Sequence, residues 1–200
     1  MALAMWDKLR IEEQVVDLLE TYYTKFQFPL DVFELAEKAH IRIIQYSQPD
    51  PDLAALMRLT SGDAFSIIDT YSRRATICYN DSIQPITRQR YSIAHEIGHI
   101  RLEHDRADNR QSEAEADYFA GYLLAPHPLI IHYNLFGRTA EIFKVSQQAA
   151  DIADHQAKIR SRYSSQLKPY EHTLISLSSI ETPTNIPLST APNSAIGMPF

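Results

Sequence analysis

This 200-residue chain has only one cysteine and no excess of positively charged residues. Its single cysteine, Cys78, excludes an intramolecular disulfide and a metal site built from cysteines, and it suits a reducing compartment. The formal net charge of −6 at pH 7 argues against a general affinity for nucleic acid, which requires a basic face. No run of about 18 apolar residues is present, so no membrane span is expected. Asp7 and Lys8 come too early to leave room for the apolar region of a signal peptide, and we therefore expect a cytoplasmic protein.

The composition predicts one folded domain followed by a tail. Hydrophobic residues make up 44% of the chain and charged residues 22%, which is close to the average for globular proteins. From Ser164 onward the sequence is rich in serine, threonine, proline and asparagine, and it shows no periodicity. We therefore predict a domain over residues 1–163 and an extended or disordered tail over residues 164–200.

The spacing of apolar residues predicts an α+β fold. Helical spacing at the start of the chain gives way to short segments rich in β-branched and aromatic residues, which indicate a small antiparallel sheet. Helical spacing then returns for the second half, with a polar connector at residues 105–111 and a break near Ser146. The predicted helices are residues 11–23, 32–40, 88–103, 112–125 and 139–162, and the predicted strands are residues 41–44, 53–60, 64–69 and 75–80.

The segment His95-Glu96-Ile97-Gly98-His99 matches the motif H-E-x-x-H. Histidines four residues apart share one face of a helix, so both imidazoles can bind one zinc ion. Glu96 lies beside this pair without being a ligand. Zinc lowers the pKa of a bound water towards about 7, and Glu96 can take the proton of that water. The pentapeptide alone also fits a surface helix with a solvated glutamate, so the interpretation depends on a third ligand.

Candidates for the third ligand lie in the helix predicted downstream. Glu113 and Asp117 share a face, so one carboxylate can bind the metal while the other supports a ligand histidine. We favour Glu113 as the ligand. Glu115 is the rival, although its spacing from Ser112 also fits a capping box at the start of the helix. Small residues in this helix, opposite Gly98, would let the two helices approach closely.

Together these segments resemble the ImmA/IrrE family of zinc metallopeptidases. The likeness is carried by Arg90-x-x-x-Ala94-His95-Glu96-Ile97-Gly98-His99 and by Glu113-x-x-Ala116-Asp117-x-Phe119-Ala120-x-x-Leu123-Leu124-x-Pro126. The resemblance implies a compact zincin-like metallopeptidase domain, with zinc held by His95, His99 and Glu113 and with Glu96 as general base. Asp117 stands where the family commonly has Asn or Asp, which supports its place behind a ligand. The resemblance also implies a protein substrate, a helix-turn-helix repressor or an antitoxin.

Three functional hypotheses follow from these observations. The first is a zinc-dependent endopeptidase that cleaves such a partner protein. The second is a regulator that uses the same fold to sequester or displace the partner without cutting it. The third is a DNA-binding regulator, suggested by a helix-turn-helix-like pattern at residues 143–150. The recognition-like helix that would begin at Ser146 contains Asp151 and Asp154, which are unsuited to phosphate contacts, so we expect packing helices there and no direct binding of nucleic acid.

Four further polar residues near the motif fit structural roles better than catalytic ones. His104 comes five residues after His99 and could serve the site, but we expect the helix to have ended there and His104 to cap it at the surface. His127, Tyr118 and Tyr122 could steady an oxyanion, but each is better explained by packing.

Overall fold

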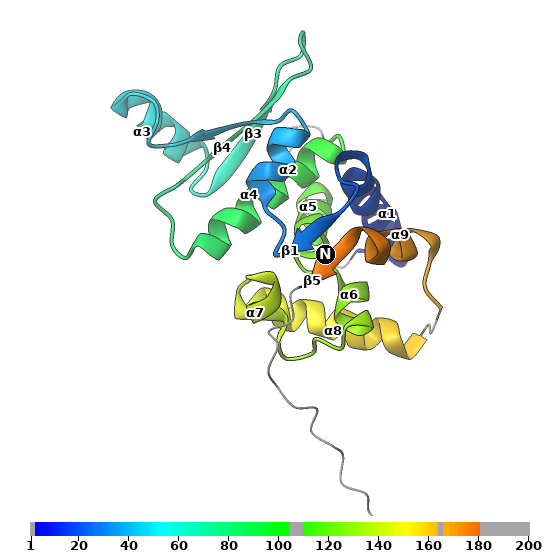
Figure 1. Cartoon of the computed structure of the whole chain (residues 1–200). Coiled ribbons are helices and arrows are strands. Elements are labelled where there is room, and N and C mark those ends of the chain that lie inside the picture. Colours follow the sequence, from blue (N-terminus) through cyan, green and yellow to red (C-terminus); the bar gives the residue numbers. More distant parts are fainter. Residues whose placement is uncertain (1–2, 105–109, 164–165, 181–200) are drawn as a thin grey trace, which may run out of the picture.

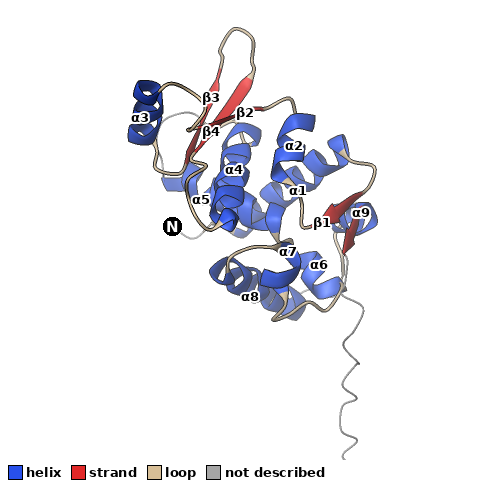
Figure 2. Cartoon of the chain, turned by 60° about the vertical axis from the view of Figure 1, so that its left-hand side comes forward, coloured by secondary structure: helices blue, strands red, loops and turns tan. Residues whose placement is uncertain are grey.

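The computed structural model describes residues 3–104, 110–163 and 166–180, and it confirms the α+β fold class. Helices dominate, and two small sheets complete the described part (Figures 1 and 2). No described helix is both long and apolar enough to cross a membrane. The helices are α1 (Met5–Tyr22), α2 (Val32–Lys38), α3 (Pro51–Thr60), α4 (Ile86–Arg101), α5 (Arg110–Leu124), α6 (His127–His132), α7 (Thr139–Phe143), α8 (Gln147–Tyr163) and α9 (Pro169–Leu177). The strands are β1 (Phe26–Phe28), β2 (Arg42–Gln45), β3 (Ala64–Ile68), β4 (Ala75–Tyr79) and β5 (Ser178–Ile180).

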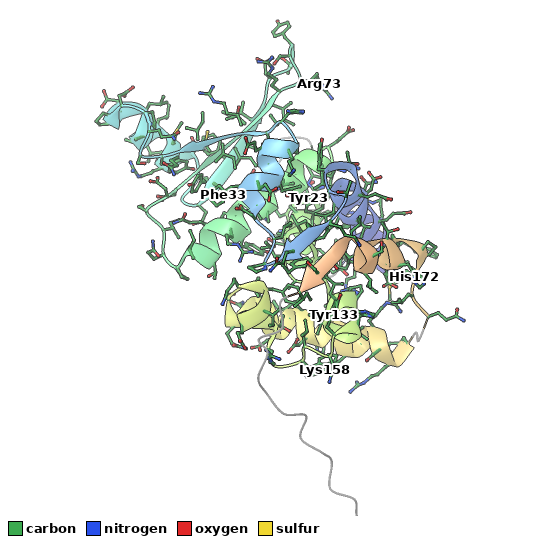
Figure 3. The ribbon with its side chains drawn as sticks, viewed as in Figure 1. Tyr23, Phe33, Arg73, Tyr133, Lys158 and His172 are labelled. Atoms are coloured by element: carbon green, nitrogen blue, oxygen red, sulfur yellow. The ribbon has the colours of Figure 1, made fainter. Side chains whose placement is uncertain are left out.

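The larger sheet has three strands in the order β2-β4-β3. β3 and β4 form an antiparallel hairpin, and Arg73 is exposed near its tip (Figure 3). β2 instead runs parallel to β4, with Ile43 opposite Ile77. The prediction of a purely antiparallel sheet is therefore wrong. The sheet is mixed because β4 lies between β2 and β3, parallel to the former and antiparallel to the latter.

The strand predicted for residues 53–60 is wrong, because these residues belong to α3. Asp50 caps this helix, and its carboxylate accepts a hydrogen bond from the amide of Leu53 at 3.1 Å. Pro51 takes the first helical position, where its missing N–H has no cost. The sequence up to Arg58 consists mainly of good helix formers and contains no β-branched residue. An N-cap followed by proline was the signal that distinguished this helix from a strand.

Helices α4 and α5 pack closely against each other in the centre of the molecule. Ile93 and Ile97 of α4 and Phe119 and Leu123 of α5 are almost completely buried, and each contributes about 1.5–3 kcal/mol by burial. Gly98 allows the close approach, since a Cβ atom there would lie 3.1–3.2 Å from side-chain atoms of Phe119. The close contact predicted for these two helices is therefore present, although the residue opposite Gly98 is a phenylalanine.

The region predicted as one helix over residues 139–162 is divided into α7 and α8. Lys144, between them, has a left-handed conformation with φ 52° and ψ 50°, which ends α7. The predicted break near Ser146 is thus confirmed.

Helix α6, which was not predicted, begins directly after Pro126. Ala150, Ala153 and Ala157 form the buried side of α8, and α6, α7 and α8 lie at the end of the molecule opposite the three-stranded sheet (Figure 1).

The prediction of an extended or disordered tail from Ser164 is wrong for residues 169–180, which form α9 and β5. Helix α9 packs on α1, and β5 pairs with β1 in parallel, with Ser178 opposite Phe26. Glu171 begins α9 by accepting a hydrogen bond from the amide of Lys168 at 2.6 Å. His172 is exposed on the same helix (Figure 3). Residues 164–165 and 181–200 of the predicted tail, and residues 105–109 of the predicted connector, lie outside the described residues.

Candidate metal centre

Helix α4 presents Tyr91, His95 and His99 at successive turns of one face. Ile93 and Ile97 on another face are buried in the core. Burial of these apolar side chains fixes the rotation of the helix about its axis, so the tyrosine and the two histidines line a cleft. The position of the site therefore follows from the apolar pattern of the same helix.

Arg90 fastens this helix to two other parts of the chain. Its guanidinium donates hydrogen bonds to the carbonyl of Leu30 at 3.0 Å and to the carbonyl of Phe143 at 3.1 Å, and it also contacts the carbonyl of Lys144. Phe143 is the last residue of α7, where carbonyl groups lack partners within the helix. Arg90 thus has a structural role that explains its place in the motif segment.

The structure brings the three predicted metal ligands together. The Nε2 atoms of His95 and His99 lie 2.9 Å apart. The carboxylate oxygens of Glu113 lie 3.4 Å from Nε2 of His95 and 3.3 Å from Nε2 of His99. Ligand atoms about 2.0–2.1 Å from a tetrahedral zinc ion are about 3.3–3.4 Å apart, so both carboxylate distances fit a single ion, whereas the two Nε2 atoms lie closer together than this and would separate slightly on binding it. The side chain of Glu113 is 50% exposed, which leaves one side of the group open to solvent.

Asp117 holds His95 from the side opposite the metal position. Its Oδ1 atom lies 3.0 Å from Nδ1 of His95 and accepts a hydrogen bond from the hydroxyl of Tyr91, also at 3.0 Å. The hydrogen bond from His95 lowers the pKa of the Asp117 carboxyl, although partial burial opposes this effect. The charged carboxylate orients the ring so that Nε2 faces His99 and Glu113. Asp117 therefore lies where the sequence placed it.

A different set of side chains holds His99. Its Nδ1 atom lies 3.0 Å from Nδ1 of His104, and Nε2 of His104 lies 3.3 Å from a carboxylate oxygen of Glu115. Glu115 also accepts hydrogen bonds from Arg10 of α1 and, at 3.0 Å, from Gln111. Burial raises the pKa of Glu115, but these hydrogen bonds outweigh it and leave the pKa lowered. A chain of contacts thus connects α1 with the motif.

The prediction that His104 caps the helix at the surface is wrong, because its side chain is only 8% exposed. Helix α4 ends at Arg101, and Glu103 has a left-handed conformation with φ 53° that turns the chain back. The amide of His104 then donates to the carbonyl of His99 at 3.1 Å. The imidazole of His104 consequently points inward beside that of His99.

Glu115 lies apart from the predicted ligands. Among the described residues, the group that can hold an ion around His95 and His99 is completed by Glu113. The capping-box interpretation of Ser112 and Glu115 is also wrong. The described part of α5 already begins at Arg110, so Ser112 lies within the helix.

Glu96 lies in the cleft, which has a volume of about 600 Å³ and is also lined by His95, His99 and Glu113. The residue is 9% exposed. Burial raises the pKa of its carboxyl, and hydrogen bonding to Ser66 of β3 opposes the shift without cancelling it. A raised pKa makes the carboxylate a better proton acceptor than an exposed glutamate, which suits a general base.

A comparison with protein families agrees with this geometry. The model of the IrrE N-terminal-like domain, a peptidase family (Peptidase_M78), matches residues 36–153. The chain belongs to this family. The IrrE-like domain extends from α2 into α8 and includes both helices of the site, so the family supports a function of the metallopeptidase type. No curated protein matches the chain.

A second cluster of titratable residues lies partly outside the IrrE-like domain. Glu12 of α1, His127 of α6 and Glu171 of α9 are all buried, and their ligand atoms are close enough to hold one ion. However, Arg160 forms an ion pair with Glu171, and Lys168 forms one with Glu12 at 3.5 Å. Two carboxylates therefore face two cations. We interpret this cluster as a charge-balanced connection of α9 to the domain and not as a second metal site.

The three residues considered for oxyanion stabilisation lie at this second cluster and not in the cleft. Tyr118 donates a hydrogen bond to Glu12 at 2.6 Å, and Nε2 of His127 lies 3.7 Å from the same carboxylate. The side chain of Tyr122 packs against the ring of His127. Burial lowers the pKa of His127 to about 4, so its imidazole is neutral at pH 7. The packing interpretation of these residues fits the structure.

Sequence reasoning missed Tyr91, Arg10 and Ser66, which support the centre, and it assigned His104 to the surface. Tyr91 had a detectable signal, because it precedes His95 by one helical turn and so shares its face. The other three reach the site only through a turn or from a separate element, and their spacing in the sequence carried no such signal.

Proposed function

We propose that this IrrE-like chain is a zinc-dependent endopeptidase that cleaves a helix-turn-helix repressor or an antitoxin-type partner. One observation carries the proposal: Glu96 lies in the same cleft as the group formed by His95, His99 and Glu113. A metal position next to a partly buried carboxylate is the arrangement that hydrolysis of an amide requires.

The donor set favours zinc over harder cations. Two imidazole nitrogens and one carboxylate, with a fourth position open, are typical of catalytic zinc sites. Zinc bound there would polarise the scissile carbonyl and acidify a water molecule. Asp117 and His104 keep the rings of His95 and His99 oriented, so that both Nε2 atoms point at the same position.

Glu96 would transfer the proton in this reaction. Its ionised carboxylate accepts the proton of the attacking water and then gives that proton to the nitrogen of the leaving amine. Because burial raises the pKa of Glu96, the protonated form is easier to reach than for an exposed glutamate. Ser66 contacts the same carboxyl and limits the shift, so that the ionised form stays available.

The substrate would bind as an extended segment along the edge of β3. This strand pairs with β4 on one side and forms one edge of the three-stranded sheet. A peptide that pairs with a sheet edge is held by main-chain hydrogen bonds, which place its carbonyl groups at fixed heights along the strand. Ser66 lies in this strand and contacts Glu96, so the bound segment would lie next to the general base.

The kind of partner and the compartment are part of the same proposal. A repressor or antitoxin substrate is supported by the likeness of the two motif segments to the ImmA/IrrE family, whose members typically act on such proteins. Regulation of transcription by removal of a repressor would take place in the cytoplasm. Cys78, a buried free cysteine, is compatible with such a reducing compartment.

The test combines metal analysis with digestion of a purified helix-turn-helix repressor. We expect about one zinc ion per chain in the wild type and in Glu96→Gln, and loss of the metal in Glu113→Ala. Glu115→Ala is the matched control and should retain zinc at saturating concentration. Only the zinc-loaded wild type should cut the partner. Release of an intact partner from DNA by both the wild type and Glu96→Gln would overturn cleavage and favour a sequestering regulator.

A further inference from the structure

An apolar groove lies beside the cleft, between α4, α5 and α8. It consists of two adjoining cavities of about 470 and 480 Å³. The walls that the two cavities share carry no formal charge. We call this space the α8 groove, and its shared walls are Tyr91, Gly121, Ala125, Gln148, Ala149 and Ile152.

The α8 groove adjoins the cleft of the metal centre. Tyr91 and Asp117 line both the first cavity of the groove and the cleft. Asp117 also lies within hydrogen-bond distance of His95, at 3.0 Å. An extended peptide advances about 3.3 Å per residue, so a peptide whose carbonyl lies at His95 has a neighbouring side chain within reach of the groove.

Gly121 borders the open space of the groove. It lies within α5, and glycine inside a helix makes that helix less stable than alanine would. A Cβ atom at this position would meet no atom within 4 Å, so packing does not require glycine here. Gly98 in α4 is different, because a Cβ atom there would press on Phe119. What Gly121 provides is therefore the empty space next to its backbone.

The opposite wall of the groove, on α8, combines Gln148 with apolar side chains, one of which is accessible. Ile152 of α8 is 57% exposed, although α8 buries its alanines against the domain. The size of each cavity lies within the range of about 300–1,000 Å³ that is usual for ligand sites. An apolar side chain entering the groove would cover Ile152 and would contact the ring of Tyr91 without desolvating any charged group on the shared walls.

We propose that the α8 groove binds a large apolar side chain of the substrate, of the size of leucine, methionine or phenylalanine, one or two residues from the scissile bond. This inference rests on the proposed peptidase function and adds a specificity site to it. The occupant is a peptide segment because the groove adjoins the cleft, with Tyr91 and Asp117 forming a wall common to both. The groove would thus select the position of the cut, while the edge of β3 would bind any extended segment.

The test is a graded filling of the groove with Gly121→Ala and Gly121→Leu. His155→Leu is the matched control, since it adds a similar apolar group at an exposed position of α8 that lines neither cavity. Zinc-loaded proteins are incubated with an equimolar library of blocked octapeptides, and the cleavage sites are read by mass spectrometry. In parallel, each substitution is combined with Glu96→Gln, and capture of library peptides is measured without hydrolysis.

We expect the wild type and His155→Leu to prefer a large apolar residue near the cut. Gly121→Leu should reduce kcat/KM for these peptides about tenfold or more relative to their alanine-containing counterparts, with a smaller effect for Gly121→Ala. An unchanged preference in Gly121→Leu would overturn the groove as a specificity site. If no peptide is cut, the peptidase proposal fails, and capture decides about the groove: Gly121-dependent capture of apolar peptides supports it, and capture that is insensitive to Gly121→Leu refutes it.

Discussion

The Nδ1 atoms of His99 and His104 lie 3.0 Å apart, so a histidine beyond the end of α4 holds a histidine of the H-E-x-x-H motif. Glu115 and Arg10 continue this chain of contacts to α1. Helix α1 precedes the residues that match the IrrE-like family, yet it reaches the metal centre through these side chains. Four predictions follow from this and from the other contacts.

Replacing His104 by alanine should weaken zinc binding. Without the contact at Nδ1, the ring of His99 loses the partner that fixes its orientation, and loss of such a partner typically costs about 10- to 100-fold in metal affinity. Competition with a chromophoric chelator measures the change. His132→Ala, at an exposed position of α6, is the control and should bind zinc as the wild type does. Equal zinc affinity of His104→Ala and the wild type would contradict the role assigned to His104.

Alanine substitutions of two glycines should have opposite effects on stability. Gly121→Ala should raise the free energy of unfolding by about 0.5–1 kcal/mol, because it favours helix without meeting any neighbour. Gly98→Ala should lower it by about 1–3 kcal/mol, because the added methyl group presses on the buried Phe119 and forces α4 and α5 apart. Urea unfolding of the metal-free proteins measures both. A gain of stability in Gly98→Ala would contradict this prediction and would mean that the side chain of Phe119 can move aside at little cost.

The ion pair between Arg160 and Glu171 should be costly to break from one side. The two side chains are 12% and 0% exposed, so Glu171→Leu would leave a largely buried guanidinium without its carboxylate. We expect this single substitution to lower the free energy of unfolding by about 3–5 kcal/mol. The double substitution Arg160→Met with Glu171→Leu should recover much of this loss, because neither member of the pair is then left as an unpaired buried charge. If the free-energy changes of the two single substitutions simply add up in the double variant, the two side chains are not coupled and the prediction is wrong.

Acid should destabilise the fold through His127. Burial lowers its pKa in the folded protein from 6.5 to about 4. Below pH 6.5 the unfolded chain therefore binds a proton that the folded protein does not. The free energy of unfolding consequently decreases as the pH is lowered from about 6.5 to about 4. Between pH 7.5 and pH 5 this loss is about 2 kcal/mol. His127→Gln should remove that part of the pH dependence when unfolding is measured in the presence of a chelator, whereas the exposed His155→Gln should retain it.

The sequence alone predicted the α+β class and the two segments that carry the centre. Residues four apart on a helix share a face whatever surrounds the helix, so His95 with His99 and Glu113 with Asp117 could be paired before any packing was known. The strand predicted at residues 53–60 was wrong although its sequence contained the relevant signal, an N-cap Asp50 followed by Pro51. Helix α9 was missed in a similar way, since Pro169 at its first position and Glu171 two residues later mark a helix start.

Only the tertiary structure decided how separate elements meet. The parallel pairing of β2 with β4, the inward turn of His104 at Glu103, and the opening of the α8 groove beside Asp117 depend on backbone turns and on packing between elements. Spacing along the chain fixes angles within one helix or strand, because these have a constant period. It does not fix distances between elements, because these depend on loop conformations and on the mutual fit of buried side chains. The metal ligands could therefore be predicted from the sequence, whereas the residues that orient and surround them became apparent only in the folded chain.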